Sequence, residues 1–167
     1  MKHQRGLILI ELIAVIVLVG IIASFTGFFL YTGINGYLNA QRSLEGALKA
    51  QTALDRMTLE LRSISYFTSA PTAASVFYRS DDSRLPGSRV LKYQAGSGTG
   101  AILIGVDGTD YPLLDGVSSF ALLIDYLNLN DDPLVDEVAG IGIGFKLEGV
   151  GKEFKTRIFP RNLVAEY

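Results

Sequence analysis

Acidic and amide side chains gather near residue 130, and this stretch is the densest source of metal ligands in the sequence. Asp131, Asp132, Asp136 and Glu137 lie close together beside two asparagines. Carboxylate and amide oxygens are the ligands that Ca²⁺ prefers, but the spacing does not match the loop of an EF-hand. We therefore expect a solvated acidic loop and no cofactor, and we keep a calcium site at these four residues as the alternative.

Two glycine-rich stretches are candidates for phosphate-binding loops. Residues 140–144 carry glycine at every second position, whereas a dinucleotide-binding turn needs its third glycine further along and a helix after it. Residues 96–100 lack the lysine of a phosphate-binding loop and lie between two apolar runs. We interpret the first stretch as part of a strand and the second as a hairpin loop.

Side chains that serve most often in catalysis are scarce in this sequence. Cysteine is absent and His3 is the only histidine, which excludes thiol chemistry and any zinc site built from cysteine. No pair of carboxylates stands in a recognisable catalytic motif. The net charge of −2 does not indicate a general nucleic-acid surface. An enzyme is therefore the least favoured class.

One carboxylate, Glu11, lies in a long apolar run. No other charged residue occurs in residues 7–31, which exceeds the roughly 20 residues needed to span a bilayer core. A carboxylate at the centre of a membrane helix costs roughly 2.5–3.5 kcal/mol, so such a residue is by default a candidate for function. Glu11 should therefore have a partner.

Basic residues surround the apolar run unevenly. Lys2, His3 and Arg5 precede the run, and the first charge after it is Arg42. The positive-inside rule then predicts a cytoplasmic N-terminus and an exported remainder. An ordinary secretory signal is the alternative, although residues 23–24 make a poor cleavage site.

The N-terminal pattern resembles the class III signal of bacterial type IV prepilins and pseudopilins. Gly6 is followed by five apolar or acidic residues ending at Glu11, with Lys2 and Arg5 upstream. The resemblance implies that a prepilin peptidase cleaves between Gly6 and Leu7 and methylates the new N-terminus at Leu7. Members of this family most often have phenylalanine where Leu7 stands. Cleavage would also remove the only histidine.

The same resemblance implies a partner for Glu11. In an assembled filament its carboxylate would meet the N-terminal amine of a neighbouring subunit and set the register of the helices. The further partners implied are other pilins or pseudopilins, through the N-terminal helix, and an assembly platform in the inner membrane. A glutamate that only extends towards the cytoplasmic interface is the alternative.

Two later stretches resemble one group within this family. Residues 111–120, leading to Asp125 and Tyr126, and residues 156–163 are similar to minor pseudopilin J of type II secretion and related minor pilins. Residues 53–64 are similar too, and the retention of Glu11 argues against the pseudopilin K type.

Beyond the membrane segment the apolar spacing predicts that the helix continues to about residue 65. An apolar stripe recurs at intervals of three, four or their sums, at Leu38, Leu44, Leu48, Leu54, Leu61 and Ile64, with Ala47, Met57 and Thr58 between them. We place the charged residues on the opposite face: Arg42, Glu45, Lys49, Asp55, Arg56, Glu60 and Arg62. Opposite charges three or four apart, such as Arg56 and Glu60, should pair.

After Pro71 the sequence predicts short strands and turns. We expect seven strands, at residues 75–79, 89–94, 101–106, 111–114, 117–127, 138–147 and 154–159. Closely spaced strands without intervening helices predict an antiparallel sheet, and the helix stripe is the obvious cover for its apolar face. Most of the aromatic residues should fill the core between helix and sheet, and the alternative for a minority of them is the interface to neighbouring subunits. They include Tyr66, Phe67, Phe77, Tyr78, Tyr93 and Phe120.

These observations predict an α+β, pilin-like fold with four parts. Residues 1–6 form a leader, residues 7–31 a transmembrane helix, residues 32–65 its amphipathic continuation and residues 66–167 an extracytoplasmic β-rich head. The expected function is that of a structural minor pseudopilin or minor pilin in the bacterial inner membrane, which takes a position at or near the tip of a filament. The alternative is a membrane-anchored extracytoplasmic binding module.

Overall fold

The computed structural model describes residues 4–129, 136–162, 164–165 and 167. The chain divides into two compact units, Met1–Arg42 and Ser43–Tyr167. Helix α1 (Gln4–Arg62) supplies the described part of the first unit and the first element of the second. The strands found in the described residues all belong to the second unit.

The first unit presents apolar side chains that no described part of the chain covers. The large hydrophobic residues from Leu9 to Tyr37 are exposed without a break in the series. The hydroxyl groups of Ser24, Thr26 and Thr32 donate to carbonyl oxygens four residues earlier, at 2.8–3.0 Å, so these polar groups are satisfied inside the helix. The chain thus has one N-terminal helix that is long and apolar enough to span a membrane.

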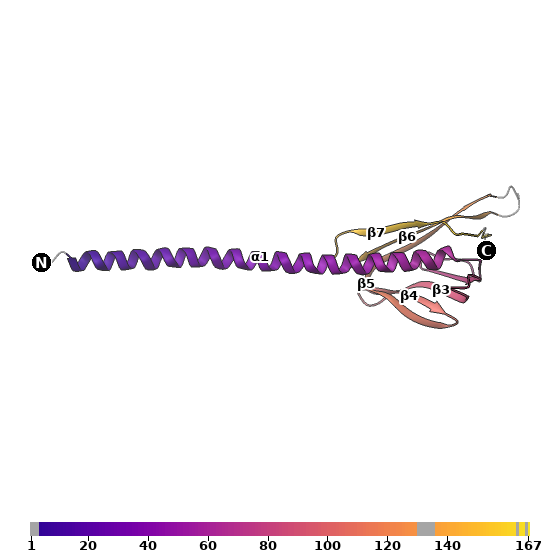
Figure 1. Cartoon of the computed structure of the whole chain (residues 1–167), viewed down its shortest axis with the longest axis horizontal. Coiled ribbons are helices and arrows are strands. Elements are labelled where there is room, and N and C mark those ends of the chain that lie inside the picture. Colours follow the sequence, from indigo (N-terminus) through magenta and orange to yellow (C-terminus); the bar gives the residue numbers. More distant parts are fainter. Residues whose placement is uncertain (1–3, 130–135, 163, 166) are drawn as a thin grey trace. The chain divides into compact units, whose positions relative to one another are not determined.

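The second unit contains a seven-stranded antiparallel sheet in which the strands follow one another in chain order. The strands, most of them labelled in Figure 1, are β1 (Tyr66–Phe67), β2 (Ser75–Ser80), β3 (Gly87–Gln94), β4 (Gly100–Val106), β5 (Thr109–Leu127), β6 (Glu137–Leu147) and β7 (Glu153–Ile158). Alternation in β6 and β7 agrees with the prediction, because Ile141, Ile143 and Phe145 are buried and Lys155 and Arg157 are exposed. One helix on an antiparallel sheet confirms the α+β class.

Strand β5 differs from the prediction of two strands separated by a turn. Gly116 has a φ of +71°, and a register shift in the pairing with β6 lies between Val117 and Ser119. A single left-handed residue bends a strand without reversing it. As a result the first half of β5 pairs with β4 and the second half with β6, which joins the two halves of the sheet.

The end of α1 and the short strand β1 also differ from the prediction. Helix α1 ends at Arg62, earlier than expected, because the Ser63 hydroxyl and amide both bond to the carbonyl of Glu60, at 2.7 and 3.2 Å. A serine that bonds to a nearby carbonyl in this way competes with the helix. Just before β1, the Ser65 amide donates to the carbonyl of Arg79 at 2.9 Å.

The core lies between the sheet and the part of α1 that belongs to the second unit. Its helical members are Ala50, Ala53, Leu54, Met57 and Leu61, followed by Ile64 just beyond the helix. The predicted stripe was therefore correct only in its second half. Leu38, Leu44 and Leu48 are 41, 62 and 61% exposed, because the face that packs on the sheet passes through Ala50 and Ala53 instead.

The aromatic residues divide between core and surface. Phe67 and Tyr78 are buried, and Tyr93 stacks on Phe120 with ring centroids 5.7 Å apart at the edge of the core. Tyr66 and Phe77 are exposed and form the minority that lies outside the core. Both alternate with an inward-facing neighbour in their strands, and their side chains point away from the helix.

Candidate functional site

The N-terminal candidates lie on one continuous stretch of helix. Gly6 and Leu7 are within the helical backbone of α1, and Glu11 lies one turn beyond Leu7. The Glu11 side chain is exposed, as are those of its neighbours Ile10 and Leu12. No acidic residue occupies the first turn of α1, so in the uncleaved chain Glu11 is too far from the helix start to gain much from the helix dipole.

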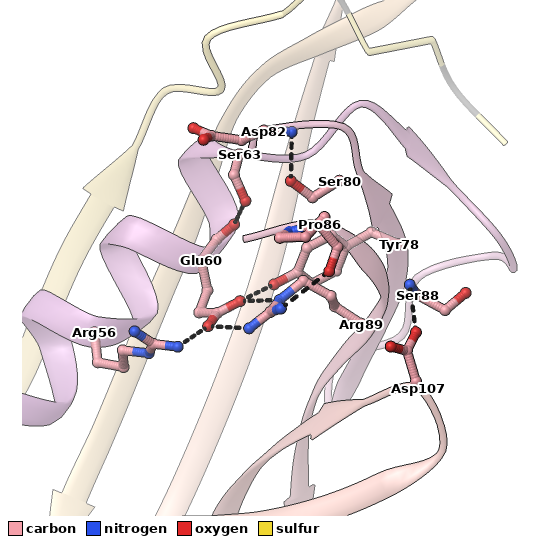
Figure 2. A network of polar contacts seen from close by, with 10 residues as sticks. All are labelled: Arg56, Glu60, Ser63, Tyr78, Ser80, Asp82, Pro86, Ser88, Arg89 and Asp107. Carbon is pink, nitrogen blue, oxygen red and sulfur yellow. Dashed lines mark hydrogen bonds and ion pairs between the residues drawn. The ribbon is translucent and has the colours of Figure 1, made fainter. Parts of the chain in front are cut away.

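The strongest electrostatic feature of the described residues is elsewhere, around Glu60 (Figure 2). This side chain is 0% exposed. Arg89 donates to it twice, from Nε to Oε2 at 2.6 Å and from a terminal nitrogen to Oε1 at 2.7 Å. Arg56 donates to Oε1 at 2.6 Å and the Tyr78 hydroxyl to Oε2 at 2.8 Å. Both carboxylate oxygens are therefore saturated with donors.

Three elements hold this network in place. Glu60 and Arg56 are one turn apart on α1, which lets their side chains meet. Tyr78 on β2 and Arg89 on β3 are direct cross-strand partners, so their side chains emerge side by side on the inner face of the sheet. A terminal nitrogen of Arg89 also reaches the carbonyl of Pro86, at 3.4 Å.

The surroundings of Glu60, Tyr78 and Arg89 shift the pKa of each group in the direction that favours an ionised Glu60, a neutral Tyr78 and a charged Arg89. Burial alone would raise the pKa of Glu60, but the hydrogen bonds from Arg89 and Tyr78 and the charges of Arg89 and Arg56 outweigh it and lower that pKa. Burial, together with the neighbouring Glu60 carboxylate, raises the pKa of the Tyr78 hydroxyl. The hydrogen bond to Glu60 raises the pKa of Arg89. The network therefore fixes the helix on the sheet and offers no free base.

Sequence reasoning placed Glu60 on the solvent-facing side of the helix, and this was wrong. The predicted pair with Arg56 is confirmed at 2.6 Å, but it forms at the edge of the core. Glu60 lies three residues after Met57 and four before Ile64, both fully buried. This helical spacing places Glu60 on the buried face of α1, although a charged side chain is usually exposed.

The predicted calcium residues can be followed only in part. Asp131 and Asp132 lie outside the described residues. Asp136 is exposed, whereas Glu137 is 3% exposed and accepts a hydrogen bond from the Leu129 amide at 2.8 Å. Glu137 is thus not a member of a solvated loop, because it begins β6 and its carboxylate supports the neighbouring backbone. Among the described residues there is no group of three or more acidic or histidine side chains arranged to hold a metal ion.

Comparisons with known proteins add no family assignment. No protein-family model matches the chain. No curated protein and no solved structure matches it significantly.

Proposed function

We propose that this chain is a structural minor pseudopilin or minor pilin that a prepilin peptidase cleaves between Gly6 and Leu7. After cleavage and methylation of Leu7, its N-terminal helix would join the helices of other pilins or pseudopilins in a filament. That filament would be a type II secretion pseudopilus or a type IV pilus, assembled by a platform in the bacterial inner membrane. The sheet-bearing unit would lie outside the cytoplasm, at or near the tip.

The observation that supports the proposal most strongly is the position of Glu11 in a helix whose apolar side chains are exposed. The side chains around it are apolar and exposed, and none of the most apolar part of α1 is buried. Such a surface needs lipid or other helices around it. A lone carboxylate in those surroundings is costly unless a cation meets it.

Cleavage after Gly6 would create such a cation and would also improve the local electrostatics of Glu11. The helix would then start at Leu7, which brings Glu11 into its first turns, where free amide groups favour a negative charge. The new amine of a neighbouring subunit would neutralise the carboxylate. Loss of one partner from a buried pair of this kind costs about 3–5 kcal/mol, which corresponds to roughly two to four orders of magnitude in an assembly constant.

The deciding experiment is the intact mass of the chain recovered from membranes, with and without a prepilin peptidase in the cell. The proposal predicts a peptidase-dependent chain that starts at Leu7 and carries one added methyl group. A chain that keeps residues 1–6 would favour a membrane-anchored binding module, and a chain cut near residues 23–24 would favour a secreted protein.

A second experiment separates assembly from processing. Glu11→Gln keeps the size of the side chain and removes its charge, so we expect a processed protein that is missing from sheared filaments. Ile16→Val is the matched control, since it changes one exposed apolar side chain in the same helix and leaves the charge pattern intact. Equal recovery of both variants in filaments would refute the role of Glu11 in register.

A further inference from the structure

Two adjoining clefts open where α1 ends, and both belong to the unit Ser43–Tyr167. The larger has a volume of about 500 Å³ and is lined by Arg62, Asp81 and Asp82 among others. The smaller, of about 240 Å³, is lined by Arg56, Leu59, Arg84 and Leu85 among others. Ser63, Asp82 and Arg161 line both, so the two form one continuous depression.

The charges around this depression are unequal. Arg56, Arg62, Arg84 and Arg161 line it, against Asp81 and Asp82, although the whole protein has a net charge of −2. Glu60 lies beneath Arg56 and is already saturated, mainly by Arg89. The depression therefore has an excess of positive charge that the rest of the protein does not share.

Asp82 holds two of these arginines in position. Its carboxylate accepts from the Arg84 backbone at 2.9 Å and from the Arg84 side chain at 3.0 and 3.2 Å. Arg161 reaches it once, at 3.5 Å. The hydrogen bonds from Arg84 lower the pKa of Asp82 to about 2. Among the described residues Asp82 is the side chain that pairs with Arg161, and the other guanidinium donors of Arg161 face no acidic partner there.

Arg62 is less engaged still. Among the described residues no acidic side chain pairs with it, and its backbone carbonyl accepts a bond from the Arg161 amide at 3.2 Å. That bond brings together the main chains of residues 62 and 161, which both line the larger cleft. Two guanidinium groups with free donors thus line one depression, an arrangement suited to a carboxylate.

Two leucines form the apolar part of the lining of the smaller cleft. Leu59 is 53% exposed and Leu85 is half-buried. An aliphatic or aromatic side chain placed there would remove both leucines from water while an adjacent carboxylate reached the arginines.

We propose that this depression is a docking site for an acidic segment of another protein, in which a carboxylate stands beside an apolar side chain. Arg62 and Arg161 bind the carboxylate, and Leu59 and Leu85 contact the apolar side chain. A nucleic acid fits less well, because Asp81 and Asp82 would face its continuous line of phosphates. The docking site does not depend on filament assembly. The binding test can therefore refute this site without refuting the proposed function, and the filament test can refute the proposed function without refuting this site.

The test uses the full chain in detergent and a short fluorescein-labelled peptide in which glutamates alternate with leucines. Fluorescence anisotropy should show saturable binding, and a peptide with glutamine in place of glutamate should bind at least about tenfold more weakly. The double variant Arg62→Gln/Arg161→Gln should lose about tenfold in affinity. The matched control is Lys146→Gln/Lys152→Gln, which removes the same charge from exposed positions elsewhere and should change affinity less than about twofold.

Several results would overturn the proposal. These are the absence of binding, equal binding of the glutamine peptide, equal losses in both double variants, and tighter binding of a single-stranded DNA of the same charge. Thermal unfolding followed by circular dichroism checks that the double variant is folded. Should it unfold, Arg62→Gln alone, at an exposed position, must still weaken binding, and Leu59→Gln must weaken it without altering the response to salt.

Discussion

Substitution of Glu60 by glutamine should be among the most destabilising single changes that conserve side-chain size. The amide keeps the volume of the carboxylate and removes its charge. Arg89, whose side chain is 5% exposed, would then be a buried cation without a counter-charge. Loss of one partner from a buried ion pair costs about 3–5 kcal/mol in free energy of unfolding.

The geometry adds to this cost. Glu60 accepts four hydrogen bonds, and glutamine has one oxygen to offer and places an NH₂ group against the remaining donors. Arg56→Gln provides the contrast, since the Arg56 side chain is 42% exposed. Its loss should cost about 0.2–1 kcal/mol, as for exposed ion pairs.

Urea denaturation of the fragment 35–167, followed by near-ultraviolet circular dichroism, measures both free energies. The same assay applies to the triple variant Glu60→Met/Tyr78→Phe/Arg89→Met, which removes the charges and the tyrosine hydroxyl together. Its free energy of unfolding should be much closer to that of the wild type than that of Glu60→Gln is, because no buried charge remains without a partner and Arg56, which loses Glu60, is 42% exposed. A loss below about 1 kcal/mol for Glu60→Gln, equal to that of Arg56→Gln, would refute the view that this carboxylate fixes the helix on the sheet.

Three further predictions concern the same unit. The stabilisation that Glu60 contributes should be fully present above the pKa of an unfolded glutamate and lost as pH falls through its lowered folded pKa; acid titration of stability should show this loss in the wild type and lack it in Glu60→Gln. The fragment 35–167 should be soluble and melt cooperatively without the apolar segment, since the compact unit begins at Ser43; precipitation or a non-cooperative melt by calorimetry would contradict this boundary. Leu61→Ala, at a fully buried position, should cost about 2–5 kcal/mol, whereas Leu44→Ala, at a position 62% exposed, should cost under about 0.5 kcal/mol in urea denaturation.

Periodicity sufficed for the elements that are long and strongly patterned. The apolar run and the three-four spacing after it predicted a helix that forms as one element, α1. Strict alternation predicted β6 and β7 and which of their side chains face the core, because a period of two leaves one possible inner face once the apolar set is known.

Hydrophobic periodicity did not predict the structure where a residue occupies a position that is unusual for its type. Asp115 and Gly116 are typical of a turn, yet in β5 the glycine only bends the strand, since both halves find neighbours to pair with. Glu60 was assigned to the surface by its charge, because the partners that make its burial tolerable, Tyr78 and Arg89, come from strands whose register the sequence does not reveal. β1 is two residues long and has no pattern to detect.

The arginine-lined depression could not be predicted from the sequence for the same reason. Arg62 and Arg161 are separated by nearly the whole head, and only the pairing of the chain after α1 with the residues that follow β7 brings them together. The sequence shows the two charges and gives no sign that they share one cleft.

The chain order of the strands has a consequence for how the molecule comes together. In the described residues each strand pairs with the strands next to it in the chain, so the sheet can grow one hairpin at a time with short loops to close. Helix α1, whose apolar face the sheet covers, precedes all seven strands in the chain. The Arg161 amide and the Asn162 side chain bond to the carbonyls of Arg62 and Ile64 at 3.2 and 3.0 Å, so the residues that follow β7 are tied to the end of α1. Before the sheet is complete, the face of α1 that carries Ala50, Met57 and Leu61 is only partly covered. A chain that stops folding before β6 pairs would leave that apolar face exposed to other apolar surfaces.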